Sequence, residues 1–253
     1  MSFWRKPAEA RKPPIPPDHL LLGVGPGDYC KVGEYALGVL EKVARLRGSD
    51  RILDVGCGPG RIAWPLAAKL GRRASYDGLD VVKAYIDWCN QSLGLDPARF
   101  RFHHADIRTT FYNPNGAIEA EDFVFPWKDG SFDLVIATSL FTHLLPRGTE
   151  HYAREIARLL APKGRLFATF FILDESGKAA AAAGRTYPTF LHEMEHGRLH
   201  DPTIPESAVA FEPEWLLPTL ESAGLAISAV HPGHWKGRPG FEYQDLVLAT
   251  KSR

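Results

Sequence analysis

Short apolar blocks alternate with amphipathic blocks along most of the chain. Apolar runs of the kind that form buried parallel strands lie at residues 51–55, 74–79, 100–105, 131–138 and 165–173. Apolar residues at helical spacing predict helices at 33–47, 62–70, 82–93 and 149–160. Strand and helix alternate from the first strand onwards, and this regularity predicts an α/β fold with a doubly wound, mostly parallel sheet.

The last third of the chain departs from this simple alternation. Residues 174–211 stand between the fifth strand and a helix at 212–223, and they are too long and too varied for a plain crossover. A chain that leaves the carboxyl end of a parallel strand emerges at the ligand crevice. We therefore interpret this insertion as a lid or substrate cap, with a contact in a homodimer as the alternative. Strands at 224–230 and 243–250 follow.

The first strand, residues 51–55, runs directly into a turn with three glycines. Gly56, Gly58 and Gly60 let the backbone turn tightly and present bare N–H groups, as nucleotide-binding turns do. The pattern is D-x-G-x-G-x-G, whereas dinucleotide folds have G-x-G-x-x-G. Asp54 at the strand end would repel a phosphate. The turn therefore predicts a nucleotide-like ligand that carries a cationic or zwitterionic group.

Acidic residues also follow the second and third strands. Asp80 lies about 20 residues beyond the glycines, where an α/β nucleotide site places the carboxylate that accepts from ribose hydroxyls. Acids at strand ends also cap helices, but this spacing from the glycine turn favours ribose binding. Asp106, after the third strand, is suited to accept from an adenine amino group while Ile107 covers the ring.

Composition narrows the class of partner. The 253 residues carry 30 basic and 30 acidic side chains, and a net charge of zero argues against a nucleic-acid or anionic-membrane surface. Cys30, Cys57 and Cys89 are odd in number and widely spaced, which indicates neither a disulfide framework nor a structural zinc site. No apolar stretch approaches the ~18 residues of a membrane span. These features predict a cytoplasmic protein with a small-molecule partner.

The residues before the first strand form a separate region. Residues 1–18 are rich in proline and basic side chains and predict a mobile or surface arm. Residues 19–33 form a glycine-rich loop, which is either a simple connector or a flap over the ligand. We expect residues 1–48 to form this arm and the first helix, and residues 49–253 to form the main domain.

Taken in order, these motifs resemble those of the class I S-adenosylmethionine-dependent methyltransferases. They are DVGCGPG after the first strand, Asp80 and Asp106 after the next two, FPWKDGSFDLVIATSLFTHL around the fourth and LLAPKGRLFATF into the fifth. The resemblance implies S-adenosyl-L-methionine as cofactor and a seven-stranded Rossmann-like sheet with an antiparallel last strand and a helical cap insertion. The cofactor residues that it implies are Asp54, Gly56, Cys57, Gly58, Gly60, Asp80, Val81, Asp106, Ile107 and Thr138.

Two departures from branches of this family narrow the expected reaction. No Asn/Asp-Pro-Pro-aromatic box follows the fourth strand, which argues against methylation of base amino groups in DNA or RNA. Thr138 and Ser139 stand where catechol-type enzymes have magnesium-binding acids. We therefore expect metal-independent transfer to oxygen or nitrogen of a small molecule.

His143 is the predicted general base, because it lies just beyond the fourth strand and its unperturbed pKa is close to working pH. A packing role against the following helix is the alternative for this residue. The predicted substrate-binding residues are Tyr29, Phe141, His231, Trp235 and Arg238. The last three lie in the loop between the final two strands and offer stacking, a titratable ring and a donor fork. Trp235 alternatively fills the core beneath the insertion.

Two other functions stand as alternatives. An NAD(P)-dependent oxidoreductase would share the sheet, but the third glycine falls one residue early and no Tyr-x-x-x-Lys pair appears. The segment HEMEH at 192–196 fits the H-E-x-x-H motif of zinc metallohydrolases, in which two histidines lie one helical turn apart. Pro188 and Gly197 leave barely two turns for such a helix, so we expect no metal site there.

Overall fold

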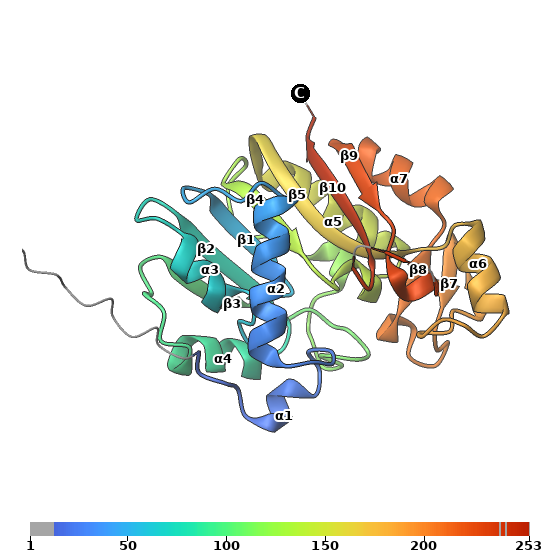
Figure 1. Ribbon diagram of the computed structural model, residues 1–253, viewed down its shortest axis with the longest axis horizontal. Helices are drawn as coiled ribbons and strands as arrows, with labels where there is room; N and C mark the ends of the chain where they lie inside the picture. Colours follow the sequence, from blue (N-terminus) through green and yellow to red (C-terminus); the bar gives the residue numbers. More distant parts are fainter. Residues whose placement is uncertain (1–12, 238, 241, 253) are drawn as a thin grey trace, which may run out of the picture.

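The computed structural model describes residues 13–237, 239, 240 and 242–252, so the expected N-terminal arm lies largely outside the described residues. Seven strands form the main sheet in the order β3-β2-β1-β4-β5-β10-β9 (Figure 1). Their bounds are β1 Arg51–Val55, β2 Ser75–Asp80, β3 Phe100–His104, β4 Phe132–Ala137, β5 Leu160–Ile172, β9 Leu225–His231 and β10 Asp245–Lys251. β10 is antiparallel to both of its neighbours, and the other main strands are parallel, which confirms the predicted sheet.

Helices cover both faces of this sheet (Figure 1). The helices α2 Tyr29–Lys42, α3 Ala63–Lys69 and α4 Lys83–Ser92 pack on one face, and α5 Pro146–Leu159 and α7 Pro213–Ser222 pack on the other. Successive residues of a strand point to opposite faces, so Ile52 joins the first apolar layer and Leu53 the second. Because both faces are covered, the central strands β1 and β4 are buried along nearly their whole length, whereas the edge strand β3 exposes polar residues.

The insertion at 174–211 contains strands as well as a helix. The helix α6 Glu175–Ala182 is followed by the short strands β6 His192–Met194, β7 Gly197–Leu199 and β8 Val209–Phe211. β8 pairs in parallel with the end of β5, so the insertion extends the sheet beyond the carboxyl end of that strand. We call residues 174–211 the cap from here on.

The zinc-type helix considered for HEMEH does not exist. His192 lies in β6, and His196 lies in the turn between β6 and β7 with φ of 67° and stacks on Trp215 at a centroid distance of 4.8 Å. The two histidines therefore do not share a helical face. Across the described part of the chain, no group of three or more His, Cys, Asp or Glu side chains is placed to hold a metal ion.

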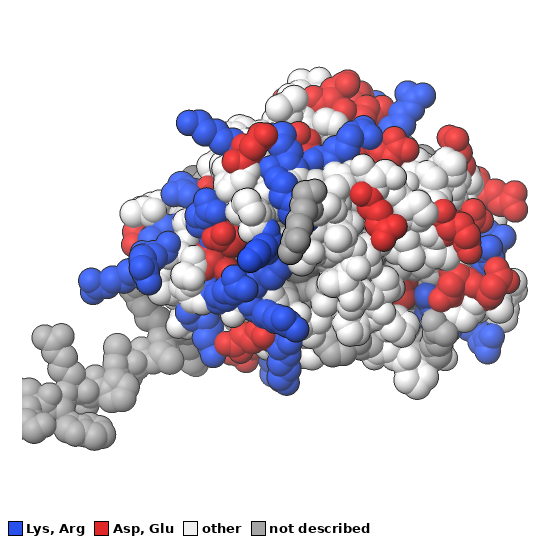
Figure 2. Space-filling model, turned by 90° about the horizontal axis from the view of Figure 1, so that it is seen from above, with Lys and Arg blue, Asp and Glu red and all other residues white. Residues whose placement is uncertain are grey.

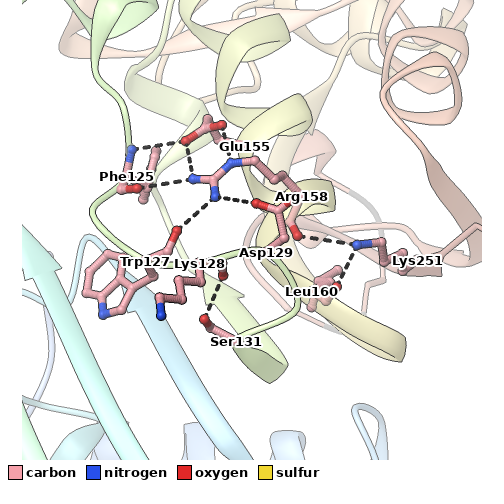
Figure 3. Close-up of polar contacts among 9 residues, drawn as sticks. All are labelled: Phe125, Trp127, Lys128, Asp129, Ser131, Glu155, Arg158, Leu160 and Lys251. Carbon is pink, nitrogen blue, oxygen red and sulfur yellow. Dashed lines mark hydrogen bonds and ion pairs between the residues drawn. The ribbon is translucent and has the colours of Figure 1, made fainter.

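Arg158 holds the turn that precedes β4. Its guanidinium binds Glu155 with two contacts of 2.7 Å and donates to the carbonyls of Phe125 and Trp127 and to the carboxylate of Asp129 (Figure 3). These donations anchor the FPWKDG part of the predicted motif to α5. This part of the motif thus fixes the position at which β4 begins. The expected ligand crevice lies at the other end of the strand.

The two ends of the strands have different surroundings. The chain ends on the side where the parallel strands begin, and the helix α1 Asp18–Leu21 lies at the opposite side (Figure 1). On the face around the C-terminus, basic groups gather on one side and acidic groups predominate on the other (Figure 2). No described helix combines the length and apolarity that crossing a bilayer requires.

Candidate functional site

The glycine turn adopts a backbone that only glycine accepts easily. Gly56, Gly58 and Gly60 have φ of 79°, 54° and 85°, in the left-handed region. A Cβ atom on Gly60 would lie 2.5 Å from Cδ2 of Leu93, so this position lacks room as well. The N–H of Gly56 donates to the carbonyl of Leu79 at 2.8 Å, which ties the start of the turn to the end of β2.

Asp80 lies beside this turn, as predicted. Its carboxylate is 8% exposed and accepts from the N–H of Gly58 and from the N–H of Val82, each at 2.8 Å. Burial raises the pKa of Asp80, and these backbone donors oppose that shift. Each carboxylate oxygen retains capacity for a second donor, so both ribose hydroxyls can bind here without displacing the backbone.

Asp54 is a buried acceptor that is half unsatisfied. It is 1% exposed, its Oδ2 accepts from the Tyr76 hydroxyl at 2.6 Å, and its Oδ1 has no hydrogen-bond partner. Burial raises its pKa to about 7, against the effect of the Tyr76 hydrogen bond. An unpaired buried oxygen at the start of a ligand-binding turn fits a site whose ligand supplies the missing donor.

The predicted adenine site lies at the end of β3. Asp106 is exposed, and its Oδ1 accepts from Nδ2 of Asn113 at 3.3 Å. Ile107 is 2% exposed and is covered by the long connection that follows, where Gly116 lies directly against the Ile107 backbone. The carboxylate is therefore open to a ligand, whereas the Ile107 side chain offers only a narrow edge. Val81 is partly buried next to Asp80.

The glycine-rich segment at 19–33 lies over the glycine turn. The Cγ1 atom of Val24 is 3.4 Å from the position that a Cβ of Gly58 would take. Tyr29, the first residue of α2, is 7% exposed and donates its hydroxyl to the carbonyl of Pro59 at 2.9 Å. Tyr29 was expected to contact the acceptor, but the structure seats it against the cofactor turn.

Polar groups meet at the end of β4, and two of the side chains involved, Thr169 and Gln244, were not predicted from the sequence. Thr138 follows the strand and is partly buried. The next residue, Ser139, donates its N–H to Thr169 Oγ1 at 2.7 Å, and Thr169 Oγ1 lies 2.5 Å from Oε1 of Gln244. A polar residue within the apolar run of β5 was the one signal for Thr169. Nothing in the local pattern indicated Gln244, because its neighbours come from distant strands.

His143 lies in the short 3-10 helix η2 Phe141–His143, directly after these residues. Its Nδ1 is 2.8 Å from the backbone carbonyl of Glu206, which belongs to the cap, and its Nε2 is 3.5 Å from the Tyr112 hydroxyl. Burial lowers the pKa of His143, and the contacts with Glu206 oppose this. The imidazole is therefore neutral at pH 7, the form that a general base requires.

Two of the predicted acceptor residues belong to the core. Phe141 is fully buried and stacks on Phe170 at a centroid distance of 4.6 Å. Trp235 is 2% exposed beneath the cap, and its Nε1 donates to Asp245 at 2.7 Å. Neither side chain has surface to offer an acceptor, so the core-filling alternative describes Trp235.

Of the other two acceptor candidates, the structure describes only His231. His231 is partly buried at the end of β9, where it pairs with Leu246. Arg238 lies outside the described residues. Lys236 is held inside the loop with its Nζ 2.9 Å from Asp174 and 3.0 Å from Asp245, which ties the loop to the cap.

The glycine turn and the acids Asp54, Asp80 and Asp106 lie in a segment that is similar to known proteins. Residues 52–164 match the profile of a family described as a methyltransferase domain. This part of the chain is therefore a methyltransferase domain. A solved methyltransferase of this fold from Burkholderia thailandensis, with bound 1,6-didemethyltoxoflavin and S-adenosylhomocysteine, has a TM-score of 0.55, 16% identity, and coverage of 89% of this chain and 79% of its own.

Curated relatives of this methyltransferase act on different acceptors. The 27-O-demethylrifamycin SV methyltransferase of Amycolatopsis mediterranei is 31% identical over 133 residues, which are 52% of this chain and 42% of that protein. A tRNA1(Val) (adenine(37)-N6)-methyltransferase of Tolumonas auensis is 29% identical over 180 residues, 63% of this chain and 68% of that protein. The chain spans less than half the length of the first two curated relatives that it matches, 42% and 31%.

S-adenosylmethionine is the cofactor of this family, and the residues present fit it. Asp80 has spare acceptor capacity for two hydroxyls, and Asp54 has an unpaired buried oxygen beside the glycine turn. The ligand carries an ammonium and a sulfonium but no phosphate, so acids around the turn attract it where they would repel a pyrophosphate.

Proposed function

We propose that this methyltransferase transfers the methyl group of S-adenosylmethionine to an oxygen or nitrogen of a small-molecule acceptor, by in-line displacement without a metal ion. The observation that supports this best is the partly buried imidazole of His143, which lies just after β4, is bonded to the cap through Glu206 and has a lowered pKa. Bound S-adenosylmethionine supplies the reactive methyl group. The protein supplies alignment of the acceptor and a place for its proton.

The proposed cofactor residues divide into three groups. Asp54, Gly56, Cys57, Gly58 and Gly60 would surround the methionine part, with Tyr29 supporting the turn from outside. The ribose would bind Asp80 next to Val81, and the adenine would bind Asp106 next to Ile107. Thr138 would face the reacting end, because it leads from β4 towards His143.

Two features support a small acceptor over a nucleic acid. The cap covers the carboxyl end of β5 and contacts His143, which restricts the entrance to the reacting centre. The sequence lacks the Asn/Asp-Pro-Pro-aromatic box after β4 that enzymes acting on base amino groups carry, and Thr138-Ser139-Leu140 stands there instead. The relative from Amycolatopsis mediterranei is named for a small-molecule acceptor, which agrees with this proposal.

Ligand binding tests the cofactor first. A thermal-shift series with S-adenosylmethionine, S-adenosylhomocysteine, NAD and NADP should show stabilisation by the first two only, about 2.7 kcal/mol at a hundred times Kd. Stabilisation by NAD or NADP alone would replace the proposal by the oxidoreductase alternative. The acceptor is then sought by incubating the protein and methyl-labelled cofactor with a metabolite extract and, separately, with total tRNA. Label in tRNA but in no small molecule would contradict the small-acceptor proposal.

A further inference from the structure

The hydrogen bonds of His143 determine which of its nitrogens can act as the base. The partner of Nδ1 is the backbone carbonyl of Glu206, 2.8 Å away, and a carbonyl can only accept. Nδ1 therefore carries the proton of the neutral ring, and Nε2 carries the lone pair. Among the described residues, the polar group facing Nε2 is the hydroxyl of Tyr112, at 3.5 Å.

The cap fixes this arrangement through a second contact of Glu206. Its carboxylate accepts from the N–H of Thr110 at 2.8 Å and also from the Thr110 hydroxyl. Thr110 belongs to the same connection as Tyr112, so one residue of the cap holds both the imidazole and the segment that faces it. Glu206 is thus a positioning residue for His143, with η3 Pro205–Ser207 as its support.

Two aromatic rings, those of Phe111 and Tyr112, lie beside the imidazole of His143. The ring of Phe111 is parallel to the imidazole within 7°, at a centroid distance of 6.4 Å, and the ring of Tyr112 stands perpendicular to both. Phe111 is 49% exposed, so this phenyl ring leaves apolar surface uncovered beside the partly buried His143. A flat apolar molecule that covered Phe111 would bury this ring and bring its own edge towards Nε2.

We propose that the acceptor of this methyltransferase is a phenolic hydroxyl. The ring of the phenol packs on Phe111, and its oxygen lies at Nε2 of His143, on the side of the imidazole where the Tyr112 hydroxyl lies. This proposal rests on the proposed function and narrows it from small molecules in general to aromatic hydroxyl compounds. The contact between Tyr112 and His143 supports this geometry, because it already places a phenol oxygen opposite the lone pair of Nε2.

Acidity separates phenols from saturated alcohols at such a base. Phenols have a pKa of about 10, whereas saturated alcohols are far weaker acids, comparable with water. A neutral imidazole whose pKa is lowered by burial is a weak base, so the transfer of a phenol proton is far less uphill than that of an alcohol proton. Burial raises the pKa of Tyr112 to about 12, so Tyr112 itself remains a neutral donor and does not compete as a nucleophile.

The reaction balances without a further reactant. The phenol oxygen forms a bond to the methyl carbon as the carbon–sulfur bond breaks, and the electron pair of that bond stays on sulfur as a neutral thioether. The phenol proton passes to Nε2 of His143, and the resulting imidazolium releases a proton to solvent. Its Nδ1–H remains bonded to the Glu206 carbonyl throughout, which stabilises the cation.

The test compares acceptor classes at equal size. The full chain is incubated with methyl-labelled S-adenosylmethionine and panels of phenols, saturated alcohols and aromatic amines, represented by 2-naphthol, decahydro-2-naphthol and 6-aminoquinoline. We expect label in the phenol panel and a loss of about 100-fold or more in His143→Gln. His143-dependent label in the alcohol or amine panel would overturn the proposal, and so would its absence from every phenol.

Calorimetry with S-adenosylhomocysteine accompanies these panels, because it separates two failures. A protein that binds this ligand but labels no phenol refutes the phenol proposal alone, whereas a protein that does not bind it refutes the proposed function as well.

Phe111→Ala should raise the KM of phenols about tenfold with kcat within twofold. Val124→Ala, a matched control at an exposed apolar residue of the same connection, should change neither constant. Equal effects in both variants would count against the contact with Phe111.

Glu206 has a separate readout. Glu206→Ala should lower kcat/KM, because the cap turn that holds Nδ1 of His143 loses its contact with Thr110, and should move the acid limb of the kcat/KM profile to lower pH, because the Glu206 carboxylate raises the pKa of the imidazole. Glu206→Gln should restore kcat/KM, since an amide oxygen can still accept from Thr110, but it should keep the shifted acid limb, since it lacks the charge. Glu119→Ala removes another carboxylate of the same connection, which binds Arg108, and should leave the profile unchanged. An unshifted profile in Glu206→Ala would refute the positioning role.

Discussion

Asp80→Asn tests the ribose site at the level of single atoms. The substitution keeps the shape of the side chain but replaces one carboxylate oxygen by an NH2 group. In the wild type, one oxygen accepts from the N–H of Gly58 and the other from the N–H of Val82, both at 2.8 Å. An asparagine amide has one acceptor oxygen, so its NH2 group must face one of these donors or the ribose.

The size of the expected changes in Kd and in the free energy of unfolding follows from the lost charge and from the backbone N–H that loses its acceptor. Hydrogen bonds to a charged group contribute about 1.5–3 kcal/mol, so the Kd of S-adenosylhomocysteine should rise about 10- to 150-fold. In the free protein, one buried N–H loses its acceptor, which should lower the free energy of unfolding by about 1–3 kcal/mol. Both effects arise at the same side chain, but different measurements report them.

Isothermal calorimetry with S-adenosylhomocysteine measures the first effect and urea unfolding the second. Asp87→Asn provides the control, since it makes the same charge change at an exposed residue of α4 that pairs with Lys83 at 2.6 Å. This control should leave the Kd unchanged. A folded Asp80→Asn protein whose Kd lies within twofold of the wild type would refute the assignment of Asp80 to the ribose.

Four further outcomes follow from the site. Burial raises the pKa of Asp54 to about 7, so the folded state holds a proton that the unfolded state releases near pH 4. The free energy of unfolding should therefore fall as the pH rises from about 4 to about 7, by up to about 4 kcal/mol, and urea unfolding of Asp54→Asn should lack this decline. Trp235→Ala should lower the free energy of unfolding by about 3–5 kcal/mol without changing the Kd of S-adenosylhomocysteine, and a weakened Kd with unchanged stability would contradict its core role. Gly60→Ala should weaken this binding at least tenfold by calorimetry, because its Cβ atom has no room, whereas Gly38→Ala, with nothing within 4 Å, should not. EDTA should leave methyl transfer unaltered, since the H-E-x-x-H segment lies on a hairpin; loss of activity that zinc restores would contradict this.

The sheet and its cofactor edge were predictable because their signals are local. The central strands β1 and β4 are mostly apolar, and each of the first three strands ends in, or is followed within two residues by, an acid or a glycine. The ends of the strands were predicted less accurately. β5 begins at Leu160, five residues before the predicted strand, because Leu160 pairs with Phe132 across an irregular stretch in which Lys163 has φ of 65°. Such pairings depend on a distant strand and leave no mark in the local pattern.

The cap shows the limit of motif matching. HEMEH has the letters of a zinc helix, but β6 pairs with β7 and β7 pairs with β8, which itself continues from the end of β5. The three short strands hydrogen-bond to one another and, through β8, to the end of β5, and this pairing outweighs a helix of two turns. His196 consequently occupies a left-handed turn position, which no helical register provides.

The loop between β9 and β10 misled the prediction for a different physical reason. Trp235 was predicted to bind the acceptor, but Trp235 and its neighbour Lys236 both bind the buried carboxylate of Asp245. One Asp245 oxygen accepts from Gly233 N–H and faces Lys236, and the other accepts from Ile172 N–H and Trp235 Nε1. Four donors saturate the carboxylate, so none of these groups can turn outward without leaving a buried charge unpaired. The part of the loop around Trp235 and Lys236 is therefore held in the core, and we propose that the acceptor side is formed around His143 instead.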